Sequence, residues 1–140
     1  MELSGKLTII TGASRGIGRA LAVELARSGC GLLVTALESD ELNHLLNELR
    51  AFPVKVATMA ADLSDTEDLK RVLNWILAHE QPPDILVNSA GIGGHFGRFE
   101  QIKLSDIERT IALNVSALVH LTHELIPILR KKASCENSQH

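Results

Sequence analysis

The chain has 140 residues, of which 45% are hydrophobic and 22% are charged, and its net charge is −3. This length suits one compact domain and excludes two full domains, while the hydrophobic share excludes a disordered chain. The slightly acidic balance argues against a general affinity for nucleic acid or for anionic membranes.

Cysteine usage and the N-terminus bear on the cellular compartment. Cys30 and Cys135 are too few to staple a small secreted domain, so a reducing compartment fits. The chain begins Met-Glu-Leu, with an acid where a signal peptide carries cations. No uninterrupted apolar stretch approaches the roughly 18 residues that span a membrane. We therefore expect a cytoplasmic protein with no membrane partner.

Short apolar runs alternate with segments of helical spacing in the first half of the chain. A buried strand is predicted over 7–10, and a helix follows over 16–28. A second strand is predicted over 31–35. The helix after it begins near Ser39 and is stopped by Pro53.

The alternation continues in the second half of the chain. A third strand is predicted over 54–59, followed by a helix with a capping box that begins at Ser64. A fourth strand over 85–87 leads through a glycine-rich loop into a long helix, which starts at a second capping box at Ser105 and ends near Pro127. Alternating strands and helices with short connections predict an α/β fold, a doubly wound parallel sheet with helices on both faces.

The turn between the first predicted strand and helix has the sequence TGASRGIG, residues 11–18. A dinucleotide pyrophosphate needs unpaired backbone N–H groups at a helix N-terminus and no side chain that blocks its approach, and glycines supply both. A glycine turn without a ligand is the alternative; the flanking strand and helix favour the ligand. The candidate cofactor-binding residues in this turn are Gly12, Ser14, Arg15, Gly16, Ile17 and Gly18.

The TGxxxGxG spacing of this turn resembles the short-chain dehydrogenase/reductase family, whose fold is Rossmann-like. Asp62-Leu63 resembles the family's aspartate motif at the adenine ring, and Asn88-Ser89-Ala90-Gly91 resembles its NNAG motif with Ser as the second residue. Asn114 is similar to the helix asparagine of the family's catalytic tetrad. The resemblance covers about residues 5–129. It implies cofactor contacts at Asp62, Leu63, Asn88, Ala90 and Gly91, and a catalytic role for Asn114.

These polar positions also have structural interpretations. Asp62 could have the purely structural role of starting the next helix, and Asn88 could form a turn without contacting a ligand. Asn114 interrupts an apolar helical stripe, so its buried amide must find partners and a polar site should face that helix.

Histidines outside these motifs give weaker signals. His120 and His123 have a spacing that can bind metal, but no third ligand is apparent, so we expect no metal site. His95 and Phe96 could approach a substrate or lie in a surface loop.

The choice between NAD and NADP depends on the residues near the adenosine ribose. Arg15 resembles the basic residue of NADP-preferring family members. The second family determinant, at the end of the second strand, is Ala36-Leu37 instead of an acid or an arginine. Glu38 could bond a ribose hydroxyl, or it could open the second helix as a solvated charge. The sequence favours NADP, with NAD as the alternative.

In the resembled family, hydride passes between the nicotinamide and a carbonyl or alcohol carbon. A Tyr, supported by a Lys and a Ser, donates or accepts the accompanying proton. This chain contains 0 Tyr, so we expect no catalysis by it alone.

Residues 1–129 are predicted to form a partial dinucleotide-binding domain with strand order 3-2-1-4, and the polar residues 130–140 are predicted to form a disordered tail. The unpaired fourth strand predicts marginal stability and self-association.

Three functional hypotheses follow. The first is the cofactor-binding half of an NAD(P)(H)-dependent oxidoreductase, which would act on a small carbonyl or alcohol substrate only if the missing half is supplied. The second is a non-catalytic dinucleotide-binding or regulatory module. The third is an inactive truncation product.

Overall fold

The computed structural model describes residues 2–93 and 97–138. Four strands form one parallel sheet in the order β3-β2-β1-β4, as the sequence predicts. In chain order they are β1 (Leu7–Thr11), β2 (Gly31–Ala36), β3 (Val56–Ala60) and β4 (Ile85–Asn88). The doubly wound, Rossmann-like fold class is therefore confirmed, with an incomplete sheet.

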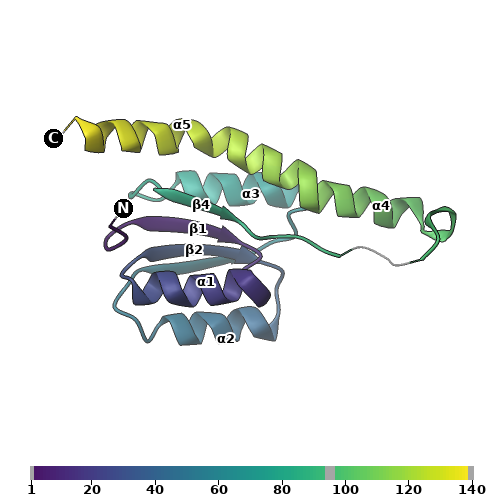
Figure 1. The fold of residues 1–140 in the computed structure, drawn as a ribbon, viewed down its shortest axis with the longest axis horizontal. Coiled ribbons are helices and arrows are strands. Elements are labelled where there is room, and N and C mark those ends of the chain that lie inside the picture. The colour runs from purple at the N-terminus through teal and green to yellow at the C-terminus, as the bar shows by residue number, and fades with distance from the viewer. Residues whose placement is uncertain (1, 94–96, 139–140) are drawn as a thin grey trace.

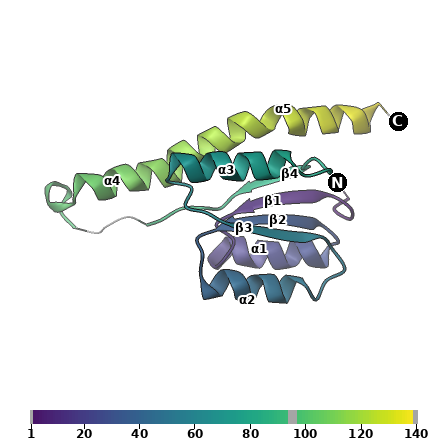
Figure 2. The same ribbon diagram turned by 180° about the vertical axis from the view of Figure 1, so that it is seen from behind.

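Helices cover both faces of this sheet (Figures 1 and 2). α1 (Gly16–Arg27) and α2 (Asp40–Leu49) lie on one face, while α3 (Thr66–Leu77) and α5 (Leu118–Asn137) lie on the other. Each face has its own core: one groups Ile10 and Val34 with Leu45, the other Ile9 with Ile76. Burial on both sides explains why the strands are almost continuously apolar.

Parallel pairing brings the carboxyl ends of the strands to one edge of the sheet. Thr11 at the end of β1 lies opposite Thr35 of β2 and Asn88 of β4. Open α/β sheets bind their ligands at this edge, beside the turns that follow the strands. The glycine turn at residues 11–18 (the phosphate turn) and the segment 88–91 therefore lie next to each other, although they are far apart in the sequence.

Two local features differ from the sequence prediction. β3 begins at Val56, whereas the predicted strand began two positions earlier. The cap of α3 is Asp65, whose side chain accepts a hydrogen bond from the N–H of Glu67. Ser64 does not cap the helix because its hydroxyl donates to Asp62 Oδ1 at 2.6 Å.

The predicted long helix is a chain of three helical segments, α4 (Leu104–Ile111), the π-helical turn η2 (Ala112–Ala117) and α5. A short 3₁₀ turn, η1 (Phe99–Gln101), precedes them. Ser105 lies inside α4 instead of capping it, and the N-cap position is Lys103. The three segments together extend past the sheet at both ends (Figure 1).

The prediction of a disordered tail over 130–140 is wrong for the part that the structure describes. α5 continues through Pro127 to Asn137. Lys132 explains part of this continuation, because its Nζ donates to Asp84 Oδ2 at 2.7 Å and to the Pro82 carbonyl at 3.0 Å. Asp84 in turn accepts a hydrogen bond from the Leu7 N–H at 2.8 Å. These tertiary contacts attach the helix to the sheet, and local composition does not reveal them.

One helical stretch, Leu104–Cys135, is long and apolar enough to cross a membrane by length and composition, with a best-window mean hydropathy of 1.3. The core helices of soluble proteins also meet these criteria. Leu121 and Leu125 of this stretch are packed in the core beside α3. The expected absence of a membrane partner therefore stays a prediction.

Candidate functional site

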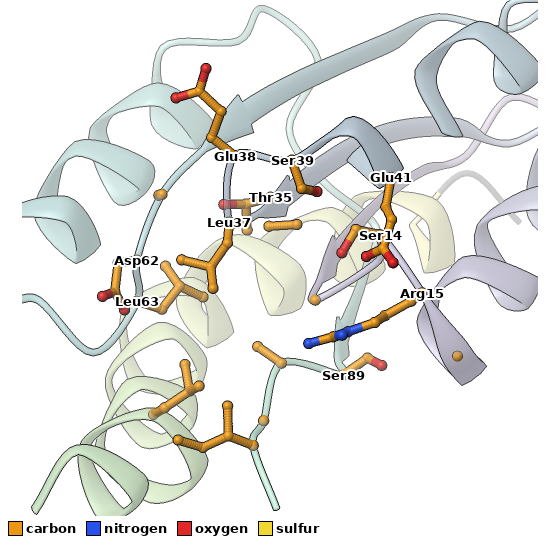
Figure 3. A pocket seen from close by; sticks show the side chains of 18 of the residues that line it. Ser14, Arg15, Thr35, Leu37, Glu38, Ser39, Glu41, Asp62, Leu63 and Ser89 are labelled. Carbon is orange, nitrogen blue, oxygen red and sulfur yellow. The ribbon is translucent and has the colours of Figure 1, made fainter. Parts of the chain in front are cut away.

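A cleft of about 530 Å³ opens at the carboxyl edge of the sheet (Figure 3). Its volume is typical of a small-molecule site. Nine of the predicted cofactor-binding residues line it: Gly12, Ser14, Arg15, Gly16, Ile17, Asp62, Leu63, Ala90 and Gly91. The structure therefore brings together segments that follow β1, β3 and β4.

Close backbone approach in the phosphate turn requires glycine at two positions. A Cβ on Gly12 would lie 2.5 Å from Ala90 Cα, and a Cβ on Gly18 would lie 2.7 Å from the Gly12 carbonyl oxygen. Thr11 fastens the two segments, because its Oγ1 accepts the N–H groups of Ser89 at 3.1 Å and Ala90 at 3.0 Å. Gly18 thus shapes the cradle without lining the cleft.

The start of α1 is open toward the cleft. No side chain caps it, whereas Ser39 caps α2 and Asp65 caps α3. The first N–H groups of a helix need acceptors, and the helix dipole favours an anion there. A phosphate group fits this end, because Gly16 at the first helical position leaves open space where a Cβ would stand.

Asp62 and Leu63 lie across the cleft from the phosphate turn (Figure 3). Asp62 Oδ1 accepts hydrogen bonds from the N–H and hydroxyl of Ser64, and Oδ2 lies 3.9 Å from Arg109 Nη2. The Asp62 side chain is 37% exposed, so it remains open to the cleft while it organises the start of α3. Both interpretations of this residue are compatible with its position.

Asn88 bonds to α5 instead of lining the cleft. Its Nδ2 donates to Thr122 Oγ1 at 3.1 Å, which ties the end of β4 to α5. Asn88 is also not among the residues that line the cleft. Its geometry supports the structural interpretation, and a direct cofactor contact stays a prediction.

Asn114 lies in the π-helical turn η2 and holds the loop after β4. Its Oδ1 accepts from the Ile92 N–H and its Nδ2 donates to the Ile92 carbonyl, both at 2.8 Å. The Asn114 amide, which is partly buried, thus finds the partners that the sequence required. In this arrangement Asn114 is a positioning residue, and its predicted catalytic role stays untested. A π turn of this kind often marks a functional position.

Charged side chains of both signs line the cleft. Arg15 is the cation among them, and no ion pair joins it to any other residue in the described ranges. Glu41 extends toward Ser14, whereas Glu38 points away from the cleft (Figure 3). A second phosphate near Arg15 would therefore meet one attractive and one repulsive side chain.

Seven further lining residues were not predicted from sequence as site residues: Thr35, Ser39, Glu41, Ala61, Ser89, Ile92 and Leu113. Ser89 could have been found as part of the motif after β4. The others carry no local signal, because they reach the cleft only through sheet pairing and helix packing.

Two weaker sequence signals remain to be placed. His123 Nδ1 lies 3.3 Å from Glu124 Oε1, and no group of three metal-ligating side chains gathers within 2–93 and 97–138. The expected absence of a metal stays a prediction. His95 and Phe96 lie outside the described residues.

Comparison with known proteins identifies the family. Residues 6–136 match the short chain dehydrogenase family. The chain belongs to this family. The match includes residues 130–136, the first part of the predicted tail. The predicted resemblance is confirmed.

Two curated members of the short chain dehydrogenase family illustrate the similarity. The 7alpha-hydroxysteroid dehydrogenase of Escherichia coli strain K12 is 30% identical over 131 residues, which cover 94% of this chain and 51% of that protein. The 3-oxoacyl-[acyl-carrier-protein] reductase of Pseudomonas aeruginosa is 40% identical over 92 residues, which cover 66% of this chain and 37% of that protein. The chain thus spans about half the length of curated short chain dehydrogenases that it matches.

Solved structures of short chain dehydrogenases share the fold. L-sorbose reductase from Gluconobacter frateurii, complexed with NADPH and L-sorbose, superposes with a TM-score of 0.84 at 31% identity, covering 94% of this chain and 51% of that one. A metagenomic short-chain oxidoreductase in complex with NADP gives 0.85 at 32% identity, covering 92% of this chain and 58% of that one.

Proposed function

We propose that this chain is the coenzyme-binding half of an NAD(P)(H)-dependent oxidoreductase. The observation that carries the proposal is the uncapped start of α1, which faces a cleft whose glycines leave room for a pyrophosphate. The similar solved structures with NADPH and NADP support the same ligand. Carbonyl or alcohol chemistry is proposed from the family.

The residues of this chain would bind and orient the coenzyme. The N–H groups at the start of α1 would hold the pyrophosphate, and Leu37 and Leu63 would enclose the adenine. Asn114 would keep the loop at Ile92 in place. A bound nicotinamide supplies hydride transfer.

We propose NADP as the preferred coenzyme, by a narrow margin over NAD. Arg15 supports this choice because its guanidinium has no ion pair within the described residues and lines the cleft. Leu37 supplies no charge, and Glu41 opposes a second phosphate. The margin between NADPH and NADH affinity should therefore be small.

A pair of glycine variants tests the phosphate cradle. Gly16 and Gly5 have φ angles of +63° and +80°, and at neither position would an added Cβ meet another atom within 4 Å. Gly16→Ala and Gly5→Ala should therefore lower stability by a similar amount. Only Gly16→Ala places its methyl in the cleft, so it should weaken NADPH binding about tenfold in calorimetric titration. Equal NADPH affinity of the two variants would contradict the proposed phosphate site.

A non-catalytic module is the second candidate function. The observation in its favour is the composition, since 0 Tyr leaves the chain without the family's proton donor. We expect NADPH binding without carbonyl reduction over a panel of ketones. Turnover by the chain alone would contradict this expectation, and absence of both binding and turnover would favour an inactive truncation product.

We also propose self-association and a cytoplasmic location. Within residues 2–93 and 97–138, β4 pairs with β1 and with no other strand, so one of its edges is open for hydrogen bonding. Several apolar side chains on α4, η2 and α5 are exposed, among them Ile111, Val115 and Val119. An exposed apolar surface of this kind favours association between chains.

The proposed cytoplasmic location has a separate test, which is fluorescence imaging of the tagged chain in cells.

A further inference from the structure

A second hollow lies at the opposite end of the sheet from the cleft. It has a volume of about 580 Å³, typical of a small-molecule site, and it lies between the last turn of α3 and the last part of α5. Pro82 and Pro83, which precede β4, also line it. This is the side of the sheet where β4 begins and α5 ends (Figure 1). We call it the proline pocket, since Pro127 of α5 lines it as well.

The walls of the proline pocket are mostly apolar. Six side chains form them: Ile76, Leu77, Pro82, Pro83, Pro127 and Ile128. Half of these are prolines, whose rings fix the backbone and hold the wall in one shape. Ile76 is 1% exposed and belongs to the core, and Ile128 packs against the same core. An apolar ligand would therefore meet a surface that is already formed.

The charged side chains at the proline pocket are basic. Lys131 and Lys132 line it, and none of the described residues that line it is an Asp or a Glu. Lys132 is already engaged by Asp84 and by the Pro82 carbonyl. Lys131 makes no ion pair within residues 2–93 and 97–138. Its ammonium group is therefore available to an anion that enters the pocket.

We propose that the proline pocket binds a small amphiphilic monoanion, a carboxylate attached to an apolar chain as in a fatty acid. The apolar walls would contact the chain, and the Lys131 ammonium would pair with the carboxylate. Inorganic phosphate suits the pocket less, because apolar walls would remove its water without replacing the lost hydrogen bonds. The pocket is separate from the coenzyme cleft, so this inference goes beyond the proposed function and does not depend on it.

Trp75 provides a direct signal of binding. It is the one Trp of the chain, and its ring lies edge-on to that of His79, a lining residue, with the ring centroids 5.3 Å apart. Titration of the full chain with octanoate below its micelle concentration should change the Trp75 fluorescence saturably. Acetate, which has the carboxylate without the chain, should give no saturable change.

Two variants test the role of the ammonium group. Lys131→Gln removes the cation at the pocket, and Arg130→Gln removes the neighbouring cation, which does not line it. Lys131→Gln should weaken octanoate binding about twofold to fivefold and leave binding of the uncharged octanol unchanged. Arg130→Gln should change neither affinity. Equal octanoate affinity of the two variants would overturn the assignment of the carboxylate to Lys131.

Cys135 reports where the ligand lies. Its thiol is exposed and lines the pocket, whereas Cys30 is 0% exposed. Octanoate at about ten times its Kd should slow alkylation of Cys135 by iodoacetamide about threefold to tenfold. Unchanged alkylation would show that octanoate binds elsewhere and would overturn the proposal.

The coenzyme separates this inference from the proposed function. Saturating NADPH should leave the protection of Cys135 by octanoate in place, and its loss would put octanoate in the cleft and overturn the proposal. If octanoate protects Cys135 but NADPH does not bind, the proposed function alone is wrong. If neither Trp75 nor Cys135 responds to octanoate, the proline pocket does not bind this class of ligand.

Discussion

Individual side chains at the cleft divide into those that shape it and those that face its ligand. Thr11 and Asn114 shape it, because their side chains form hydrogen bonds with the backbone of the loop after β4. Arg15 and Glu41 face it with opposite charges. We expect the balance of charge between Arg15 and Glu41 to set the preference between NADPH and NADH.

Glu41→Gln should raise the affinity for NADPH, because it removes a negative charge from the cleft. We expect a gain of about twofold to fivefold with NADH affinity unchanged, the range typical of exposed charges. Glu38→Gln is the matched control: Glu38 also lines the cleft, but its carboxylate is directed away from it (Figure 3), so the substitution should have a smaller effect. Titrations at low and high salt check the cause, because screening reduces a charge effect. An unchanged ratio of NADPH to NADH affinity in Glu41→Gln would refute this account.

At the scale of elements, a polar cluster around Lys132 holds the last part of α5 to the segment that precedes β4. Lys132 contacts Asp84, whose side chain is only 7% exposed, and Asp84 also bonds the first residue of β1. Partial burial strengthens such a pair and makes the loss of one partner costly. The neighbouring Lys131 is less buried and makes no ion pair with the other described residues.

Lys132→Met should therefore destabilise the chain by about 1–3 kcal/mol, since Asp84 would lose its counter-charge in a mostly buried position. Lys131→Met should change the free energy of unfolding by less than about 0.5 kcal/mol. Urea unfolding followed by circular dichroism measures both. If the segment after 129 were disordered, the two variants would unfold at the same urea concentration.

At the scale of the whole molecule, the sheet is incomplete on the β4 side. The described residues form a sheet of four strands. Three residues of β4 are only partly buried and Asn88 is exposed, whereas all five residues of β1 are buried. In addition, α4, η2 and α5 carry exposed apolar side chains. A chain with this surface buries less apolar area than a complete domain and should be marginally stable.

Self-association should depend on the concentration of the chain. We expect sedimentation velocity to show a shift from monomer to larger species as the concentration rises, because apolar contact and edge pairing both favour association. Val119→Glu, at a position that is 58% exposed, should reduce the shift without loss of the fold. A monomer that unfolds cooperatively at high concentration would argue against this prediction.

Most of the fold could be predicted from the sequence. Alternating apolar runs and helical periodicities are local, so the strand and helix order, the parallel sheet and the glycine turn at residues 11–18 followed from neighbouring residues alone. The nine predicted residues that line the cleft belong to motifs that directly follow strands. These features depend on short-range chemistry, which a linear sequence displays.

Tertiary structure decided what depends on contacts between distant residues. The attachment of α5 required Lys132 to meet Asp84, and the position of Asn88 required Thr122. Neither pairing is visible in local composition, so the helical end of α5 was mistaken for a tail. Packing of distant segments, rather than propensity, determines these positions.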